Sequence, residues 1–139
     1  MERVVIGVDP AKRSHAIEVI DEHEKTLASG VFVNDNAGYR QMRRATVGFL
    51  NRAWAVEGAG GVGRQLAQRL IADGETVVDV PPKLSTRVRA MSTGHGRKTD
   101  PTDARAVAIV GLRNRELTQV VIDDETVALR LLSERRRHG

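Results

Sequence analysis

The 139-residue chain contains no cysteine. Disulfide bonds, thiolate nucleophiles and cysteine-ligated zinc are therefore excluded, and a cytoplasmic location is the simplest expectation. No apolar run approaches the roughly 18 residues that a membrane-spanning helix needs, so we expect no membrane partner. The first residues, MERVVIGVD, do not read as a secretory signal. Aromatic residues make up 3% of the chain, which argues against a base-stacking platform for single-stranded nucleic acid.

Positive charge is concentrated in the second half of the sequence. Residues 1–80 carry 10 Lys and Arg against 11 Asp and Glu, whereas residues 81–139 carry 12 against 7. Positions 83–98 hold five basic residues and no acidic one. Arg outnumbers Lys by 18 to 4, which favours bidentate contacts with phosphate. A polyanionic partner and an ordinary solvated surface both fit this charge pattern.

The length and the apolar patterning predict one α/β domain. Three early segments read as strands, and their short connections favour an antiparallel meander. The first is mostly apolar and is expected to be buried on both faces until Pro10 ends it. The second alternates between apolar and polar residues and is expected to be half-buried. These three strands are expected at 3–8, 15–21 and 26–33.

A strand, a helix and a second strand follow an intervening helix, and together they predict a right-handed βαβ unit. The helix of this unit is expected to place Val62, Leu66, Leu70 and Ile71 on one apolar side. Two further helices follow, the second with Pro101 in its first turn, and the tail reads as the start of another. The expected segments are a helix at 36–50, strands at 53–56 and 76–80, and helices at 84–91, 100–113 and 123–137.

A glycine-rich turn follows the strand that ends at Glu57. Its glycines fit G-x-G-x-x-G, and Asp79 lies 21 residues after the first of them, as in an NAD-binding Rossmann fingerprint. The strand is about the fourth of the chain rather than the first, and Glu57 would set a negative charge beside the pyrophosphate. A tight strand-to-helix turn that needs small residues is the alternative interpretation. The three glycines are Gly58, Gly60 and Gly63.

Four acidic residues form the stronger pattern. Asp9 ends the first strand and Glu57 ends the strand that would lie beside it in a mixed sheet. Asp100 and Asp103 are three residues apart at a predicted helix start, so both project from one helical face. Clustered carboxylates without cysteine suit Mg²⁺ or Mn²⁺. Each acid also has an ordinary structural interpretation as a helix cap or a surface ion-pair partner.

Four stretches carry a family resemblance. They are VVIGVDPAKRSH from Val4, WAVEGAGGVGRQLAQRL from Trp54, VVDVPPKLSTRVR from Val77 and GRKTDPTDARAVA from Gly96. In this order they resemble the insertion-sequence-110 group of transposases, which are DEDD recombinases. The resemblance runs from Arg3 to about Leu132.

The resemblance implies a RuvC-like domain of the RNase H fold, with a five-stranded mixed sheet in the order 3-2-1-4-5. It implies that Asp9, Glu57, Asp100 and Asp103 form the metal site that serves phosphodiester strand transfer. It further implies DNA and a structured guide RNA as partners, and a homo-oligomer in the full-length protein. The RuvC-like domain is expected at 1–115 and the start of a helical extension at 116–139, without the family's serine-bearing C-terminal domain.

Basic residues near the acids are the candidates for nucleic-acid contact, with surface solvation as the alternative. A non-catalytic nucleic-acid-binding module also remains an alternative function. His95, in a glycine-containing loop, is expected to be a bystander. The candidate contacts are Lys12, Arg13, Lys83, Arg87, Arg89, Arg97 and Lys98.

Overall fold

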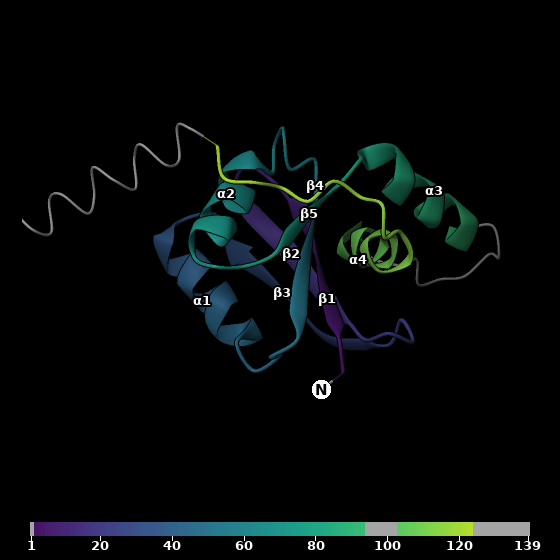
Figure 1. Cartoon of the computed structure of the whole chain (residues 1–139), viewed down its shortest axis with the longest axis horizontal. Coiled ribbons are helices and arrows are strands. Elements are labelled where there is room, and N and C mark those ends of the chain that lie inside the picture. Colours follow the sequence, from purple (N-terminus) through teal and green to yellow (C-terminus); the bar gives the residue numbers. More distant parts are fainter. Residues whose placement is uncertain (1, 94–102, 124–139) are drawn as a thin grey trace, which may run out of the picture.

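The computed structural model describes residues 2–93 and 103–123, in which a five-stranded sheet carries helices on both faces (Figure 1). Helices α1 and α2 cover one face, while α4 covers the other and α3 packs against α4. The elements are β1 (Val4–Pro10), β2 (Ser14–Ile20), β3 (Thr26–Val33), α1 (Asn36–Thr46), β4 (Arg52–Glu57), α2 (Arg64–Ala72), β5 (Val77–Val80), α3 (Pro82–Thr93) and α4 (Asp103–Arg113). None of the described helices is long and apolar enough to cross a membrane.

The sheet has the predicted order β3-β2-β1-β4-β5. Strands β1, β2 and β3 form the predicted antiparallel meander. Strand β4 pairs with both β1 and β5 in parallel, and α2 connects β4 to β5. The predicted βαβ unit is therefore confirmed, and β1 lies at the centre of the sheet, between an antiparallel and a parallel neighbour.

Strand β1 is buried on both faces, as predicted. Its residues Val4, Ile6 and Val8 belong to the core under α1 and α2, whereas Val5 belongs to the core under α4. The parallel ladder with β4 ends at Val8, and the strand then continues through Pro10, which pairs with β2 alone. The strand therefore ends at proline as predicted, but the expected range of 3–8 is two residues short, because a proline is tolerated where one side of a strand has no partner.

Strand β2 is more buried than its alternating sequence predicts. His15 is 6% exposed and Glu18 is 5% exposed, and because they lie three residues apart on a strand they occupy opposite faces, so neither face is left open to solvent there. Helix α4 packs against β2 as well as β1, so the face that carries Glu18 is covered. The Glu18 carboxylate accepts a hydrogen bond from Thr26 Oγ1 at 2.9 Å.

Three helix predictions need correction at their ends. Asp35 caps α1 by accepting a hydrogen bond from Gly38 N at 2.7 Å, but α1 ends at Thr46 rather than at 50. Val62 is 73% exposed and does not join the apolar side of α2, because the glycine turn delays the start of α2 to Arg64. Helix α3 extends beyond the predicted 84–91 at both ends.

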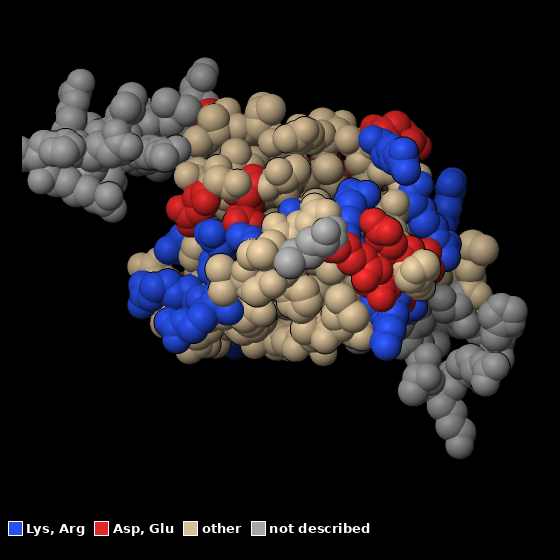
Figure 2. All heavy atoms as spheres, turned by 60° about the horizontal axis from the view of Figure 1, so that its bottom comes forward, with Lys and Arg blue, Asp and Glu red and all other residues tan. Residues whose placement is uncertain are grey.

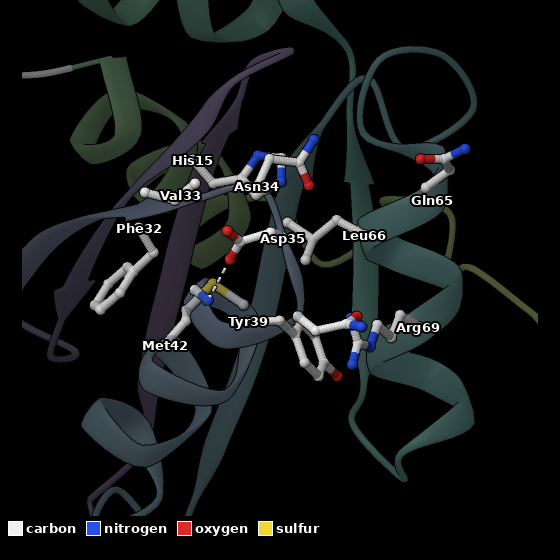
Figure 3. A pocket seen from close by; sticks show the side chains of 12 residues that line it. His15, Phe32, Val33, Asn34, Asp35, Tyr39, Met42, Gln65, Leu66 and Arg69 are labelled. Atoms are coloured by element: carbon white, nitrogen blue, oxygen red, sulfur yellow. Dashed lines mark hydrogen bonds between the residues drawn. The ribbon is translucent and has the colours of Figure 1, made fainter.

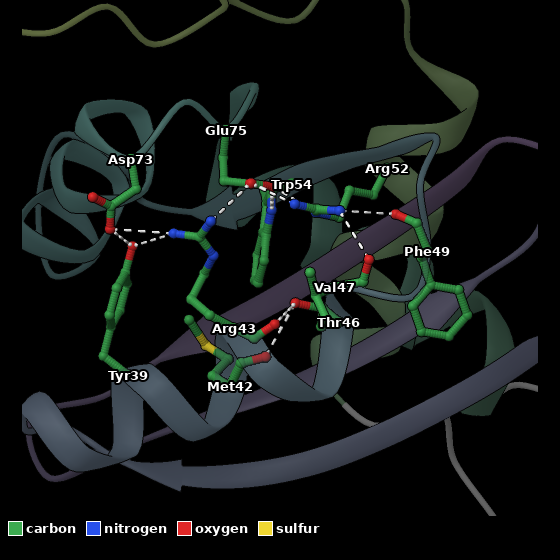
Figure 4. Close-up of polar contacts among 10 residues, drawn as sticks. All are labelled: Tyr39, Met42, Arg43, Thr46, Val47, Phe49, Arg52, Trp54, Asp73 and Glu75. Carbon is green, nitrogen blue, oxygen red and sulfur yellow. Dashed lines mark hydrogen bonds and ion pairs between the residues drawn. The ribbon is translucent and has the colours of Figure 1, made fainter.

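A polar network ties α1 to β4 and to the turn before β5 (Figure 4). The buried Glu75 carboxylate accepts hydrogen bonds from Arg52 Nε at 2.8 Å, Arg52 Nη2 at 2.7 Å and Trp54 Nε1 at 2.6 Å. Arg43 bonds both Glu75, at 3.1 Å, and Asp73, at 3.2 Å. Charged groups thus substitute for apolar packing at this end of the sheet.

The segment after α4 returns to the outer edge of β5. Asp79 N donates to the Thr118 carbonyl at 2.9 Å, and Val120 N donates to the Val77 carbonyl at 2.9 Å. Beyond this point Asp123 pairs with Arg64 of α2. The expected helix at 123–137 lies almost wholly outside the described residues, so the division of the chain at 115 stays a prediction.

Candidate carboxylate site

Sheet register places Asp9 and Glu57 side by side. Val8 pairs with Val56 in the parallel β1–β4 ladder, so Asp9 and Glu57 are the next residues at the carboxyl ends of both strands. Side chains alternate along a strand, and Gly7 and Ala55 face α4. Asp9 and Glu57 share that face, so both carboxylates lie at the end of the sheet that α4 approaches.

Helix α4 supplies the third carboxylate. It packs so close to β1 that a Cβ on Gly7 would lie 2.2 Å from the Ala104 carbonyl oxygen. Asp103 precedes Ala104 in the first turn of α4, and its carboxyl interacts with that of Asp9. The structure therefore brings three of the four predicted acids together, whereas Asp100 lies outside the described residues.

The electrostatics of Asp9 confirm how near these acids lie to one another. Burial raises the pKa of the Asp9 carboxyl, and the negative charges of Asp103 and Glu57 raise it further. A side-chain hydrogen bond with Asp103 acts in the same direction, while the Arg89 charge lowers the Asp9 pKa. The site therefore concentrates negative charge, which disfavours three ionised carboxylates without a cation.

Two side chains of α3 contact the acids. Ser85 is fully buried, and its hydroxyl lies within hydrogen-bonding distance of Glu57 Oε2 and, at 3.1 Å, of the Pro82 carbonyl. Arg89, one turn later, places Nη1 3.8 Å from Glu57 Oε2 and Nε 3.4 Å from Asp103 Oδ1. Neither role was anticipated: Ser85 was no candidate, and Arg89 was predicted to contact nucleic acid. Their i, i+4 spacing beside the core-facing Leu84 and Val88 is the signal that places them on one face.

The donors are chemically suited to a hard divalent cation, because all three are carboxylates. Within residues 2–93 and 103–123, however, no three acidic or histidine side chains are arranged to hold a metal ion as they stand. The cationic group that the structure does place there is the Arg89 guanidinium.

The predicted nucleic-acid contacts fall into three groups. Lys12, Arg13, Lys83 and Arg87 are exposed, and Arg89 is half-buried against the acids. Lys83 and Arg87 are spaced one turn apart on α3 and lie on a different side of it from Ser85 and Arg89. On the face drawn in Figure 2, basic and acidic side chains lie in neighbouring patches. Arg97, Lys98 and His95 lie outside the described residues.

The glycine turn has a structural explanation. Gly58 has a φ of +61°, and a Cβ on Gly63 would lie 2.6 Å from Val56 Cγ1. The Asp79 carboxylate, the proposed ribose ligand of the dinucleotide alternative, accepts a hydrogen bond from Ala59 N at 2.8 Å. Residues 118–121 line the hollow of about 310 Å³ beside this turn. Tight turning and close packing therefore account for Gly58, Gly63 and Asp79.

A separate hollow of about 250 Å³ lies on the other face of the sheet, between α1 and α2 (Figure 3). Several of its polar groups bond one another or nearby backbone. Asn34 Nδ2 donates to the Lys12 carbonyl at 3.0 Å, and Arg69 donates to Asn36 Oδ1 at 2.9 Å while stacking on the Tyr39 ring. These bonds tie the end of β3 to the turn after β1, and α2 to the start of α1.

Comparison with known sequences gives consistent matches. Residues 6–138 match the family model of IS110 DEDD transposases, described as a transposase. The IS116 uncharacterized 44.8 kDa protein of Streptomyces clavuligerus is 31% identical over 136 residues, which cover 97% of this chain and 34% of that protein. The IS900 uncharacterized 42 kDa protein of Mycobacterium paratuberculosis is 29% identical over 134 residues, which cover 94% of this chain and 33% of that protein. The chain thus spans about a third of the length of these relatives.

Comparison with solved structures identifies the fold. Thermus thermophilus RuvC superposes with a TM-score of 0.58 at 18% identity, over 84% of this chain and 99% of RuvC. RuvC from the same organism in complex with a Holliday junction substrate superposes with a TM-score of 0.62 at 20% identity, over 85% of this chain and 99% of that RuvC chain. The predicted RuvC-like, RNase H-like α/β fold is therefore confirmed.

Proposed function

The chain belongs to the IS110 family of DEDD transposases, and from that premise we propose that it is the metal-binding domain for phosphodiester strand transfer. The observation that carries the proposal is the convergence of Asp9, Glu57 and Asp103 from β1, β4 and α4. Asp100, three residues before Asp103, is proposed as the fourth ligand. A serine-bearing domain, as the family resemblance implies, would complete the reaction.

Each residue of the site has a distinct part. Asp9 interacts electrostatically with both of the other acids. Glu57 is oriented by the buried Ser85 hydroxyl, and Asp103, with its side chain 55% exposed, faces the side from which substrate would arrive. A bound Mg²⁺ or Mn²⁺ would polarise a backbone phosphate and stabilise the charge that develops on it.

The proposed partners are DNA and a structured guide RNA. A homo-oligomer of the full-length protein would bind them in the cytoplasm. Lys83 and Arg87 are exposed on α3, and the other side of this helix contacts Glu57, so phosphates bound by them would lie across α3 from the carboxylates. Lys12 and Arg13 are exposed on the turn directly after β1, close to Asp9 in sequence. Contacts of this kind weaken as salt is raised, because bound phosphates release counterions.

Manganese binding tests the proposal. Calorimetry on the 139-residue chain should show saturable Mn²⁺ binding that Asp9→Asn abolishes. Without metal, Asp9→Asn should unfold at a higher temperature than wild type, because the variant removes one of three mutually repelling charges. Glu22→Gln removes an exposed acid on the β2–β3 turn and should bind Mn²⁺ like wild type. Equal affinity of Asp9→Asn and wild type would refute the metal site.

The non-catalytic alternative makes a different prediction. A module that only docks on nucleic acid would retain DNA or RNA in a salt-dependent manner whether Mn²⁺ is present or not. Retention by wild type and Asp9→Asn alike, together with no Mn²⁺ binding by either, would favour that alternative.

A further inference from the structure

Arg89 occupies a special position among the basic residues of the candidate site. Its guanidinium lies 3.8 Å from a carboxylate oxygen of Glu57 and 3.4 Å from one of Asp103, and its charge also acts on Asp9. One arginine thus faces all three described acids. Its side chain is 30% exposed, so the guanidinium is partly open to solvent.

The contacts of Arg89 are loose enough to be exchanged. Both distances to the carboxylates are longer than the usual 2.7–2.9 Å of a charge-assisted hydrogen bond. The hydrogen bond that holds the guanidinium joins Nη2 to Thr86 Oγ1 on α3 itself, at 2.9 Å. Arg89 is therefore fixed to its own helix, while it is attracted to the acids without being locked onto any of them.

We propose that Arg89 is a displaceable counter-ion of the carboxylate site, which neutralises the acids in the metal-free protein and competes with the divalent metal. The inference rests on the proposed function, because it presupposes that the acids bind a metal ion. It follows from charge and geometry: a divalent ion and a guanidinium that share the same carboxylates repel each other. Metal binding then requires the guanidinium to move away from Glu57 and Asp103.

The opposite role is a positioning one. If Arg89 held Glu57 and Asp103 in the geometry that metal requires, loss of the side chain would weaken metal binding. If Arg89 competes, loss of its charge strengthens metal binding. The sign of the change in affinity therefore decides between the two roles, and both can be tested on the same variants.

The experiment is a calorimetric Mn²⁺ titration of the 139-residue chain as wild type, Arg89→Met and Arg89→Lys. Arg89→Met keeps the length of the side chain without its charge, and we expect its Kd for Mn²⁺ to fall about tenfold. The same variant should unfold at a lower temperature than wild type without metal, since the acids then lack their cation. Arg89→Lys keeps the charge and should bind Mn²⁺ within about threefold of wild type.

Arg44→Met is the control, because it removes the same charge from an exposed position of α1, on the other face of the sheet. Its affinity for Mn²⁺ should stay within about twofold of wild type, since exposed charges are screened. If Arg44→Met tightened binding as much as Arg89→Met, general charge would explain the effect and the inference would be wrong. Unchanged or weaker binding by Arg89→Met would overturn it as well.

A measurement on wild type does not depend on the variants folding. In a Mg²⁺ titration followed by NMR, the Nε–H resonance of Arg89 should shift with the midpoint of metal binding, because the guanidinium leaves Asp103. An Arg89 resonance that stays in place while metal binds would contradict the inference and leave the metal site intact. Absence of any Mn²⁺ binding in wild type, by contrast, would remove the proposed function and the inference together.

Discussion

Replacing Gly7 by alanine tests how α4 is seated on the sheet and, with it, how Asp103 reaches Asp9. A Cβ on Gly7 would lie 2.2 Å from the Ala104 carbonyl oxygen and 2.4 Å from Ala108 N. In an open strand, Gly→Ala stabilises by about 0.4–1 kcal/mol, because it reduces the entropy of the unfolded chain. Overpacking against a core costs about 1–3 kcal/mol or more, and backbone atoms cannot rotate out of the way. Because the clash is with backbone, we take the upper end of this cost and expect a net loss of about 2 kcal/mol.

The assay is thermal unfolding followed by circular dichroism, with the Mn²⁺ titration as a second readout. A loss of this size lowers the midpoint for a domain of this length by about 7 °C. Because α4 must move away from β1, Gly7→Ala should also bind Mn²⁺ more weakly than wild type. Gly60→Ala is the control, since no atom lies within 4 Å of its added Cβ, and its midpoint should change little. A Gly7→Ala protein that unfolds at or above the wild-type temperature would show that α4 does not pack directly against Gly7.

Two further substitutions address the groups around the site and the network of Figure 4. Ser85→Ala removes the hydroxyl that contacts Glu57, and it should lower the free energy of unfolding in urea by about 1–2 kcal/mol. It should also weaken Mn²⁺ binding. A Mn²⁺ affinity equal to that of wild type would refute the role of Ser85 in positioning Glu57. Burial raises the pKa of the Glu75 carboxyl, but hydrogen bonds from Arg52 and Trp54 and nearby guanidinium charges outweigh burial and lower it below the usual 4.5. Ionised Glu75 therefore contributes its full stabilisation of the fold above about pH 4.5. This contribution is lost as the pH falls through the lowered pKa, because the carboxylate is then protonated in the folded protein. Glu75→Gln should lower the free energy of unfolding in urea by about 2 kcal/mol at pH 7. The difference in this free energy between the variant and wild type should shrink at pH 3. A difference that does not change with pH would count against a lowered pKa of Glu75.

The sequence allowed the sheet and two of the site acids to be placed with little ambiguity. The apolar run before Asp9 requires a strand buried on both faces, and the βαβ pattern requires a parallel neighbour that ends at Glu57. Parallel strands bring their carboxyl ends to one edge of a sheet, so both acids were expected to meet. Asp103 also follows from periodicity, since it begins the helix whose apolar side includes Ala104 and Val107.

Other features depend on contacts between segments that are distant in sequence. Glu18 alternates with apolar residues like a solvated side chain, and only the packing of α4 over β2 shows that it is buried. The isolated β-bridge between Gln119 and Val78 has no strand-like sequence pattern around Gln119 and depends on free backbone groups of β5. The composition of α3 suggested a surface for phosphate, yet its helical phase directs Arg89 toward Glu57 instead.

Small residues explain how a site of mutually repelling acids can exist in a stable fold. A Cβ on Gly111 would lie 2.6 Å from Ala55 Cβ, and Gly7 makes the corresponding close approach near the other end of α4. The helix therefore lies with its backbone almost on the sheet, and it buries Val107 and Ala108 in the same core as Val5. This apolar contact is fixed by shape and does not depend on charge. It holds Asp103 near Asp9 whether or not a cation is present, so the repulsion between the acids is available to drive the binding of one.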